Sequence, residues 1–207
     1  MSSTPTRLVL IRHGEVEGRY QRVFGGRIDM DLSPRGQEQA RQLADHLRPT
    51  HFDAAYVSPL RRAQHTMAAL TATNGYQPVV ADDLREVDFG AWTGLSWAEV
   101  QARFGYSPFE WLDLLSQDAI PEAEPMRVFR ERVARVLDRI TAAHANQKVA
   151  VVCHGGVIRM MLAELLRLPL PALAHFEVDY ASISVVEFRP PRSELVLLNH
   201  TPGRPQP

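Results

Sequence analysis

Two histidines stand just after short apolar runs, in a setting typical of anion-binding sites. Residues 8–11 precede His13, with one arginine between, and residues 149–153 lead directly into His154. Both runs have the length and composition of buried β-strands. Each histidine is followed by glycine, which lets the backbone turn sharply and come close to a ligand. Because ligands bind beyond the carboxyl ends of parallel strands, we expect both imidazoles to contribute to one site.

Less specific interpretations of these histidines are also open. A strand-end histidine can be a buried side chain with satisfied hydrogen bonds, and one His-Gly pair alone would favour that. Zinc needs several nitrogen or sulfur ligands, but the sequence has no HxH, no HExxH and no second cysteine. We therefore predict no metal. Neighbouring strand residues point to opposite faces, so Cys153 is interpreted as a packing residue rather than a partner of His154.

Arginines close to these histidines could bind the anion. Arg12 directly precedes His13, and Arg61 and Arg62 lie near the start of an expected helix. Positive charge at a helix start is unfavourable beside the helix dipole, so this placement favours a nearby anion. The arginine fork also matches the oxygen geometry of a phosphate dianion. The alternative for Arg61 and Arg62 is a pair of solvated surface charges.

The rest of the chain must position these residues, and it alternates between strand-like and helix-like segments. Ser33 and Pro34 form a favourable helix start, and Ser58 with Pro59 is predicted to open a second helix. Further strands are expected over residues 53–57, 78–81, 183–188 and 195–198, and further helices over residues 126–140 and 157–168. This alternation predicts an α/β fold, a three-layer α/β/α sandwich with a mostly parallel central sheet.

The length suits one domain over residues 1–200. Residues 95–125 mix aromatic, acidic and proline residues, and we predict a cap-like helical insertion there. The Pro- and Gly-rich residues 201–207 are predicted to be a disordered tail.

The composition excludes several classes of function. Lys plus Arg number 23 against 24 Asp plus Glu, a net charge of -1, which favours neither nucleic acid nor membrane as a partner. The single cysteine cannot form an internal disulfide. No leader sequence is recognised in residues 1–7, and no apolar run approaches the roughly 18 residues of a membrane span. We expect a cytoplasmic protein.

Four segments, in this order, resemble the motifs of one enzyme family. They read LVLIRHGE over residues 8–15, SPLRRAQHT over 58–66, LREVDFGAWTG over 84–94 and VAVVCHGGVIR over 149–159. Each occurs in the strand or loop context that such a motif requires. From about residue 7 to residue 159, the chain resembles the histidine phosphatase superfamily, in the branch that includes cofactor-dependent phosphoglycerate mutases.

This resemblance implies a phosphoglycerate mutase-like fold and a mechanism. His13 would be the nucleophile that becomes a phosphohistidine, and Glu86 the general acid and then the general base. Asp88 is the alternative acid. The phosphoryl group would be bound by Arg12, His13, Arg62, a protonated or donating His154, and Gly155. The implied reaction is hydrolysis of a small-molecule phosphate ester without metal or cofactor.

The member of the family is less clearly indicated. The chain passes from Glu86 to residues 89–94 without the long insertion of the mutases, which favours a phosphatase over a phosphosugar or phosphoglycerate mutase. Residues 18–33 resemble α-ribazole-phosphate phosphatases, so α-ribazole 5′-phosphate is one candidate substrate. A non-catalytic relative that only binds a phosphate ligand is a third alternative, and the intact motif residues speak against it.

Three residues of the first loop are predicted to contact substrate. Arg19 stands where the family often has asparagine, and it either adds positive charge or faces the solvent. Gly25 and Arg27 belong to a glycine-containing stretch before the first helix. Residues 121–125 occupy the place of a PEGES-type run in the family, and we assign them no role. A homodimer is also considered as the assembly.

Overall fold

The computed structural model describes residues 4–107 and 110–203. A six-stranded sheet lies at its centre, in the order β3-β2-β4-β1-β5-β6. The first four strands of that order run parallel to one another, whereas β5 pairs antiparallel with both of its neighbours, β1 and β6. The strands are β1 (Thr6–Arg12), β2 (Ala54–Val57), β3 (Val79–Val80), β4 (Lys148–Cys153), β5 (Ile183–Arg189) and β6 (Arg192–His200). The predicted, mostly parallel sheet is confirmed.

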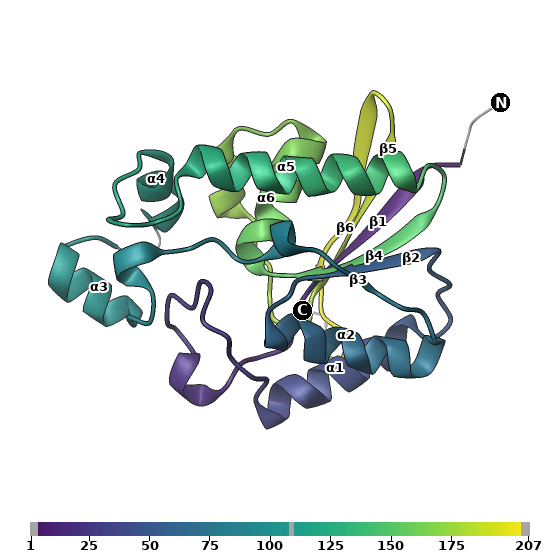
Figure 1. Cartoon of the computed structure of the whole chain (residues 1–207), viewed down its shortest axis with the longest axis horizontal. Coiled ribbons are helices and arrows are strands. Elements are labelled where there is room, and N and C mark those ends of the chain that lie inside the picture. The colour runs from purple at the N-terminus through teal and green to yellow at the C-terminus, as the bar shows by residue number, and fades with distance from the viewer. Residues whose placement is uncertain (1–3, 108–109, 204–207) are drawn as a thin grey trace.

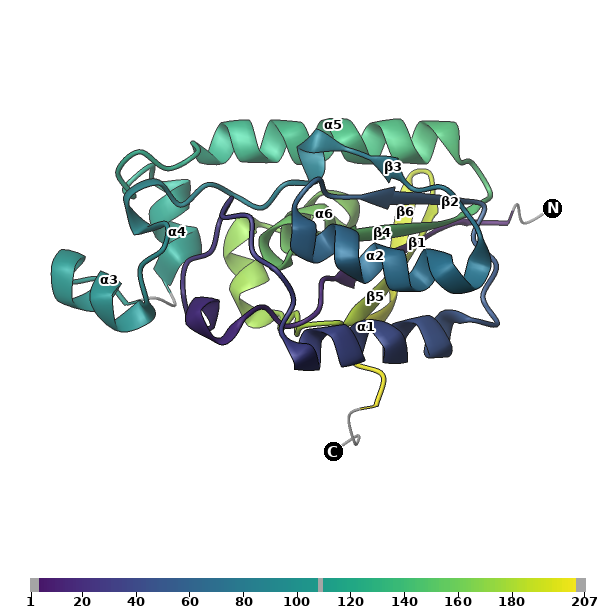
Figure 2. The same ribbon diagram turned by 60° about the horizontal axis from the view of Figure 1, so that its bottom comes forward.

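Helices cover both faces of this sheet, which confirms the three-layer architecture. Figures 1 and 2 show α1 (Pro34–Leu47) and α2 (Arg61–Asn74) on one face, and α5 (Met126–Ala143) and α6 (Gly155–Leu166) on the other. The remaining helical segments are α3 (Trp97–Phe104), α4 (Trp111–Ser116), η1 (Gly18–Tyr20), η2 (Asp82–Leu84), η3 (Gly90–Trp92) and η5 (Leu170–His175).

Strand β4 shows how the sheet supports two separate cores. Val151 packs with the apolar cluster under α5 and α6, whereas Val152 packs with the cluster under α1 and α2. Both are essentially inaccessible to solvent, with 1% and 0% exposed. Because successive strand residues point to opposite faces, a strand buried on both sides must be apolar at every position. This accounts for the continuous apolar run that the sequence places before His154.

The structure agrees with only some of the helix starts that the sequence predicts. The predicted cap of α1 is confirmed, since the hydroxyl of Ser33 accepts a hydrogen bond from the backbone N–H of Gly36 at 3.0 Å. Helix α2 begins at Arg61, so the predicted start at Ser58 is wrong. The hydroxyl of Ser58 instead lies 2.7 Å from Nε2 of His154, where it serves the site rather than the helix. Helix α6 begins at Gly155, directly after His154 and two residues before the predicted start.

The segment predicted to be a cap-like insertion contains α3 and α4, and its residues 108–109 lie outside the described residues. Figure 1 shows both helices beyond one end of the sheet, on the side toward which the parallel strands run. Of the predicted tail, residues 201–203 are described and end in a turn, and residues 204–207 lie outside the described residues. No helix of the described ranges is long and apolar enough to cross a membrane.

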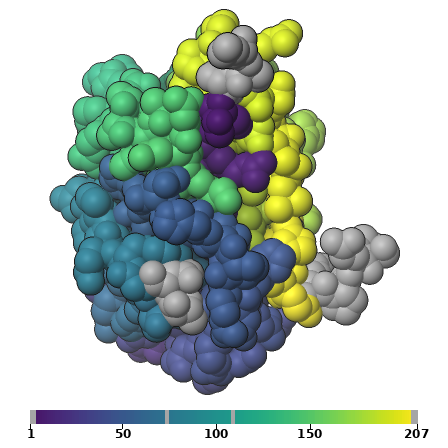
Figure 3. Space-filling model, turned by 90° about the vertical axis from the view of Figure 1, so that its right-hand side faces the viewer, coloured from purple at the N-terminus to yellow at the C-terminus, as the bar shows by residue number. Residues whose placement is uncertain are grey.

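The opposite end of the molecule is formed by the starts of the parallel strands. Figure 3 views that end, where the C-terminal hairpin in yellow lies beside the N-terminal residues in purple. The contact reflects the antiparallel pairing of β1 with β5, in which Thr6 lies opposite Phe188. The end that carries α3 and α4 is therefore the one at which the strand-end histidines gather.

Candidate active site

His13 and His154 lie side by side at the carboxyl ends of β1 and β4. These strands are parallel neighbours, with Arg12 opposite Cys153 in the register, so the residue after each strand comes next to the other. The two imidazole centroids are 5.1 Å apart, and both side chains are buried. The expectation that the two histidines meet at one site is confirmed by this geometry.

The tautomer of His13 follows from its hydrogen bonds. Nδ1 lies 2.8 Å from the carbonyl oxygen of Gly14, which can only accept, so Nδ1 carries the proton. Nε2 therefore carries the lone pair, which accepts from Nε of Arg62, 3.2 Å away. Burial, followed by the positive charges of Arg62 and Arg12, lowers the pKa of His13 well below 6.5. The imidazole is thus neutral, as a nitrogen nucleophile must be.

His154 is held between Arg62 and Ser58. Its Nδ1 lies 3.2 Å from Nε of Arg62, and an arginine N–H can only donate, so Nδ1 accepts. The proton is then on Nε2, which lies 2.7 Å from the Ser58 hydroxyl. Burial, and next the charge of Arg62, lower the pKa of His154 well below 6.5. In this state His154 is neutral: its one N–H faces Ser58, and its other nitrogen accepts from Arg62 and so orients it.

Arg62 is the most enclosed cation of the site, with 2% of its surface exposed. Its Nη1 and Nη2 donate to the carbonyl oxygens of Ile28 and Gly26, at 2.7 and 2.8 Å. Burial lowers the pKa of Arg62 to about 10, so the guanidinium stays charged at neutral pH. The side chain thus fixes the glycine-containing loop against both histidines.

His13 and Arg62 line a cavity at these strand ends, and two further arginines, Arg12 and Arg159, line it as well. Arg12 donates from Nη1 to the carbonyl of Val178 at 2.6 Å, and its guanidinium lies 4.0 Å from the ring centroid of Tyr180. Its buried Nε has no hydrogen-bond partner among the described residues. Arg159, on α6, donates from Nε to the carbonyl of Phe176 at 3.1 Å. A buried N–H without a partner is costly, so the cavity is suited to an anion that accepts from it.

Gly155 keeps this part of the cavity open. A Cβ at that position would lie 3.2 Å from Nη1 of Arg159 and 3.6 Å from Nε of Arg12. A larger side chain would therefore occupy the space between the two guanidinium groups. The glycine after His154 is used for close approach, as its position in the sequence indicates.

Glu86 reaches the same cavity from the loop after η2. Its Oε2 accepts from the backbone N–H of Gly156 at 3.1 Å, in the first turn of α6, and Oε1 accepts from the N–H of Val87 at 3.0 Å. Asp88, the alternative acid, instead accepts from the N–H of Gly90 and pairs with Arg27. The geometry places Glu86, and not Asp88, among the cavity-lining residues.

The cavity has a volume of about 660 Å³, and its lining combines two kinds of side chain. Ionisable groups come from His13, Arg12, Arg62, Arg159 and Glu86. Aromatic side chains come from several segments, namely Tyr20, Phe24, Phe89, Trp97, Trp111 and Phe176. Helices α3 and α4 supply the two tryptophans, so the segment predicted as a cap forms part of this wall.

The structure brings together only part of the residues predicted from the first loop. Gly25 lines the cavity. Arg19 does not, because it pairs with Glu17 at 3.3 Å and its guanidinium lies over the ring of Tyr20. Arg27 is also directed elsewhere, toward Asp88 at 3.4 Å and Glu124 at 3.3 Å.

Sequence reasoning missed three residues of the site. Arg159 ends the fourth motif and lies one helical turn after Gly155, so helical spacing alone could have indicated it. Tyr180 precedes β5, and its ring is 5.6 Å from that of His13. Ser58 was interpreted as a helix cap. For Tyr180 the sequence carries no spacing signal, because its approach depends on how the loop before β5 folds back.

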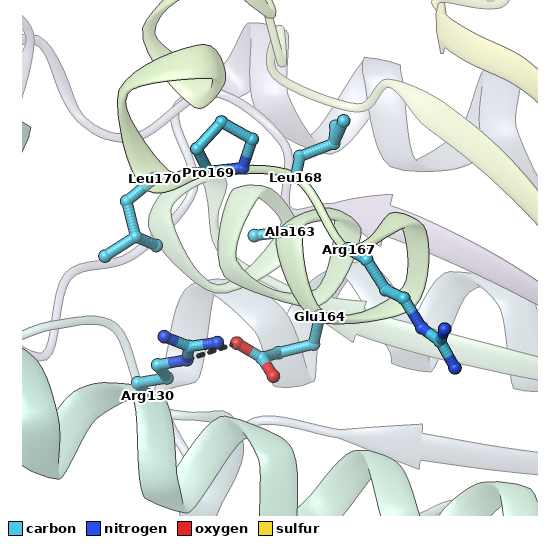
Figure 4. Close-up of a pocket in the computed structure, with 7 residues that line it drawn as sticks. All are labelled: Arg130, Ala163, Glu164, Arg167, Leu168, Pro169 and Leu170. Atoms are coloured by element: carbon cyan, nitrogen blue, oxygen red, sulfur yellow. Dashed lines mark hydrogen bonds and ion pairs between the residues drawn. The ribbon is translucent and has the colours of Figure 1, made fainter.

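A second cavity, of about 450 Å³, lies between α5 and the end of α6. Figure 4 shows the ion pair that lines it, in which Nε of Arg130 lies 2.6 Å from Oε1 of Glu164. Its other walls come from Ala163 and from Arg167 through Leu170. Since its lining holds no histidine and Arg130 is already paired, the chemistry belongs to the larger cavity. Within residues 4–107 and 110–203, no three His, Cys, Asp or Glu side chains are grouped so as to hold a metal ion.

Several proteins similar to this chain in sequence and fold are named phosphatases. The chain is 33% identical over 199 residues to phosphoserine phosphatase 1 of Hydrogenobacter thermophilus, covering 94% of this chain and 92% of that one. It is 33% identical over 195 residues to the adenosylcobalamin/alpha-ribazole phosphatase of Escherichia coli, covering 93% and 95%. The crystal structure of the alpha-ribazole phosphatase from Shigella flexneri aligns with a TM-score of 0.83, at 29% identity over 98% and 100% of the two chains.

The family model agrees with these relatives and with the four motifs. The model of the histidine phosphatase superfamily (branch 1) matches residues 8–201, almost all of the chain. The matched range includes both strand-end histidines, the three cavity arginines and Glu86. The chain belongs to the histidine phosphatase superfamily, branch 1, and is a phosphatase of that type.

Proposed function

We propose that this protein hydrolyses a small-molecule phosphate monoester by transferring its phosphoryl group to Nε2 of His13 and then to water. The observation that carries the proposal is the state of His13. Its Nδ1 is occupied by the Gly14 carbonyl, and its pKa is lowered by burial and by Arg62 and Arg12. The lone pair of Nε2 accepts from Nε of Arg62. A neutral imidazole facing a buried cation is suited to attack an anionic phosphorus centre.

The cations supply the binding energy for a dianionic ester. Arg12, Arg62 and Arg159 all line the cavity, and each is held by a backbone carbonyl. Preorganised guanidinium groups stabilise charge on the transferring oxygens because they need no rearrangement during the reaction. His154 would contribute by holding Arg62 in place.

Glu86 would handle the protons of both steps. Protonated, it would give its proton to the ester oxygen as the P–O bond breaks, and the alcohol would leave. As a carboxylate, it would then take a proton from the water that attacks the phosphohistidine. Its Oε2 accepts from the first turn of α6, which directs the carboxyl group into the cavity.

The aromatic wall supports a substrate whose alcohol carries an aromatic ring. Tyr20, Phe89, Trp97 and Trp111 line the same cavity as the three arginines. Flat rings stack on such side chains, whereas a small polar alcohol such as serine would leave them uncovered. The alpha-ribazole phosphatases among the relatives, of Escherichia coli and Shigella flexneri, agree with this preference. We therefore propose α-ribazole 5′-phosphate, in which a ribose bears an aromatic base, as the specific substrate.

Replacing His13 by alanine is expected to abolish hydrolysis. Phosphate release should be measured with a chelator present, for α-ribazole 5′-phosphate, an aryl phosphate, phosphoserine, a phosphoglycerate and a sugar phosphate. We expect chelator-resistant release by the wild type and a loss on the order of 10³-fold or more in His13→Ala. His51→Ala changes an exposed histidine outside the cavity and is the matched control. Release that persists in His13→Ala would exclude His13 as the nucleophile, and phosphate retained on an isomerised product would indicate a mutase.

Removing one ring of the wall is expected to change specificity rather than catalysis. In Trp111→Ala, kcat/KM for α-ribazole 5′-phosphate should fall about tenfold, since one stacking and burial contact contributes roughly 1–2 kcal/mol. The value for phosphoserine should change less than about threefold. Tyr106→Ala removes an aromatic side chain that packs on Trp92 and does not line the cavity, and serves as control. Equal losses on both esters would contradict the proposed substrate class.

The two buried imidazoles should also make stability depend on pH. Unfolded, each binds a proton as the pH falls through about 6.5, whereas the lowered pKa values of His13 and His154 keep the folded pair neutral to lower pH. The unfolded state gains protons first, so the free energy of unfolding should fall below pH 6.5 by about 1.4 kcal/mol per pH unit for each histidine. Urea denaturation at pH 7.5, 6.0 and 5.0 measures this slope. The double variant His13→Asn, His154→Asn should lose the contribution of both histidines to this slope, about 1.4 kcal/mol per pH unit each. An unchanged slope would show that these imidazoles are not its cause.

A further inference from the structure

Arg132 is a charged side chain in the interior, outside the catalytic cavity. It lies in the middle of α5, and only 4% of its surface is exposed. It does not line the cavity and therefore cannot touch a substrate there. A buried ion of this kind is expensive unless every donor finds an acceptor.

All five N–H groups of Arg132 have acceptors. Nε and Nη2 donate to the two carboxylate oxygens of Glu124 at 2.7 and 2.8 Å. Nη1 donates to the backbone carbonyls of Asp83 and Arg85, both at 2.7 Å. Nη2 also donates to the carbonyl of Glu86 at 3.2 Å. One guanidinium therefore holds the backbone just before Glu86 and at Glu86 itself.

Glu124 holds the backbone on the other side of Glu86. Its own N–H donates to the carbonyl of Asp88 at 3.0 Å, and its Oε2 lies 3.4 Å from the N–H of Asp88. It also pairs with Arg27, whose loop carries the carbonyls that bind Arg62. Burial raises the pKa of Glu124, but the hydrogen bonds and charge of Arg132 outweigh it and hold that pKa below its usual value. Glu124 is thus a carboxylate, as the pairing requires.

The segment around Glu86 needs these contacts because it has little regular structure. It leaves η2 at Leu84 and reaches η3 only at Gly90, so its carbonyls have no strand or helix partners over most of that stretch. Buried carbonyl groups must find donors elsewhere, and Arg132 provides them. A well-packed apolar pair can stabilise a fold as much as a buried ion pair does, but it would leave these carbonyls without donors. The specific contribution of the ion pair is therefore the backbone conformation that it selects.

We propose that the buried pair of Arg132 and Glu124 positions Glu86 for proton transfer to the leaving group. The inference rests on the proposed function, in which Glu86 is the general acid. Arg132 and Glu124 are positioning residues, since they form hydrogen bonds with the backbone within residues 83–88 and none with the carboxyl group of Glu86 that would contact the substrate. A general acid works only within hydrogen-bond reach of the oxygen that it protonates, so a shift of this loop impairs proton transfer more than phosphate binding.

Two esters with different leaving groups separate this role from a structural one. An aryl phosphate with an acidic phenol, p-nitrophenyl phosphate, needs little help from an acid, whereas ethyl phosphate needs its alcohol protonated. Glu86→Gln provides the calibration: kcat/KM should fall about 10²- to 10⁴-fold on ethyl phosphate and much less on the aryl ester. Arg132→Gln and Glu124→Gln should show the same asymmetry, with the ratio of ethyl to aryl kcat/KM reduced at least tenfold.

Two further variants, Arg132→Lys and Arg130→Gln, complete the test together with Glu124→Gln. Arg132→Lys keeps a cation with fewer donors and should restore part of the ratio. Glu124→Gln has the same shape as the native residue and serves where Arg132→Gln fails to fold. Arg130→Gln removes an exposed charge of the same helix, paired with Glu164, and should leave the ratio unchanged.

The outcomes distinguish this inference from the function on which it rests. If Glu86→Gln lowers both esters equally, the acid assigned under the proposed function is wrong. If Glu86→Gln is selective while folded Arg132→Gln and Glu124→Gln lower both esters equally, the pair is only structural and the positioning role is overturned. Selective loss in all three supports it.

Discussion

The guanidinium of Arg62 joins parts of the chain that are far apart in sequence. Its Nε lies between the imidazoles that follow β1 and β4, and its terminal nitrogens hold the loop at Gly26 and Ile28. The side chain comes from the first turn of α2, so one residue fixes a helix, two strand ends and a loop relative to one another. The site depends on this single buried cation more than on any other contact.

Such an arrangement is costly for the protein alone. Arg62 is buried, and the described side chains that accept its hydrogen bonds are two neutral imidazoles; Arg12 keeps one buried N–H without a partner in the described part of the chain. Burying positive charge without equal negative charge opposes folding. A dianionic ligand would offset that cost, because it would accept from donors already in place. The same electrostatics explain why the two imidazoles stay neutral, which leaves His13 able to act as a nucleophile.

The sequence predicts the catalytic centre better than its surroundings. Apolar runs that end in His-Gly identify His13 and His154, because a strand buried on both faces has a composition that can be recognised locally. Glu86 and Arg62 follow from motif resemblance. Arg159 could have been found from helical spacing, since it lies four residues after Gly155.

The residues that sequence reasoning misplaced depend on contacts between distant segments. Arg27 was expected to contact substrate but pairs with Glu124, nearly a hundred positions away in the chain. Ser58 is predicted to open a helix, but its hydroxyl lies against Nε2 of His154. Arg132 is not singled out by the sequence, and only the fold shows that the carbonyls of Asp83, Arg85 and Glu86 lie against it. No local sequence pattern encodes such contacts between distant segments.

The central claim is that the phosphoryl group passes through His13, and trapping the intermediate tests it most directly. Wild-type enzyme and Glu86→Gln, in which hydrolysis of the intermediate should be slowed, would be mixed with ³²P-labelled p-nitrophenyl phosphate, whose phenol needs little help from an acid to leave. The reaction would be quenched in alkali within milliseconds to seconds. The account predicts label that is stable in alkali, labile in acid and located by peptide mapping on His13, with more of it in Glu86→Gln. Label on His154 or Ser58, acid-stable label, or turnover without any labelled protein would contradict the account.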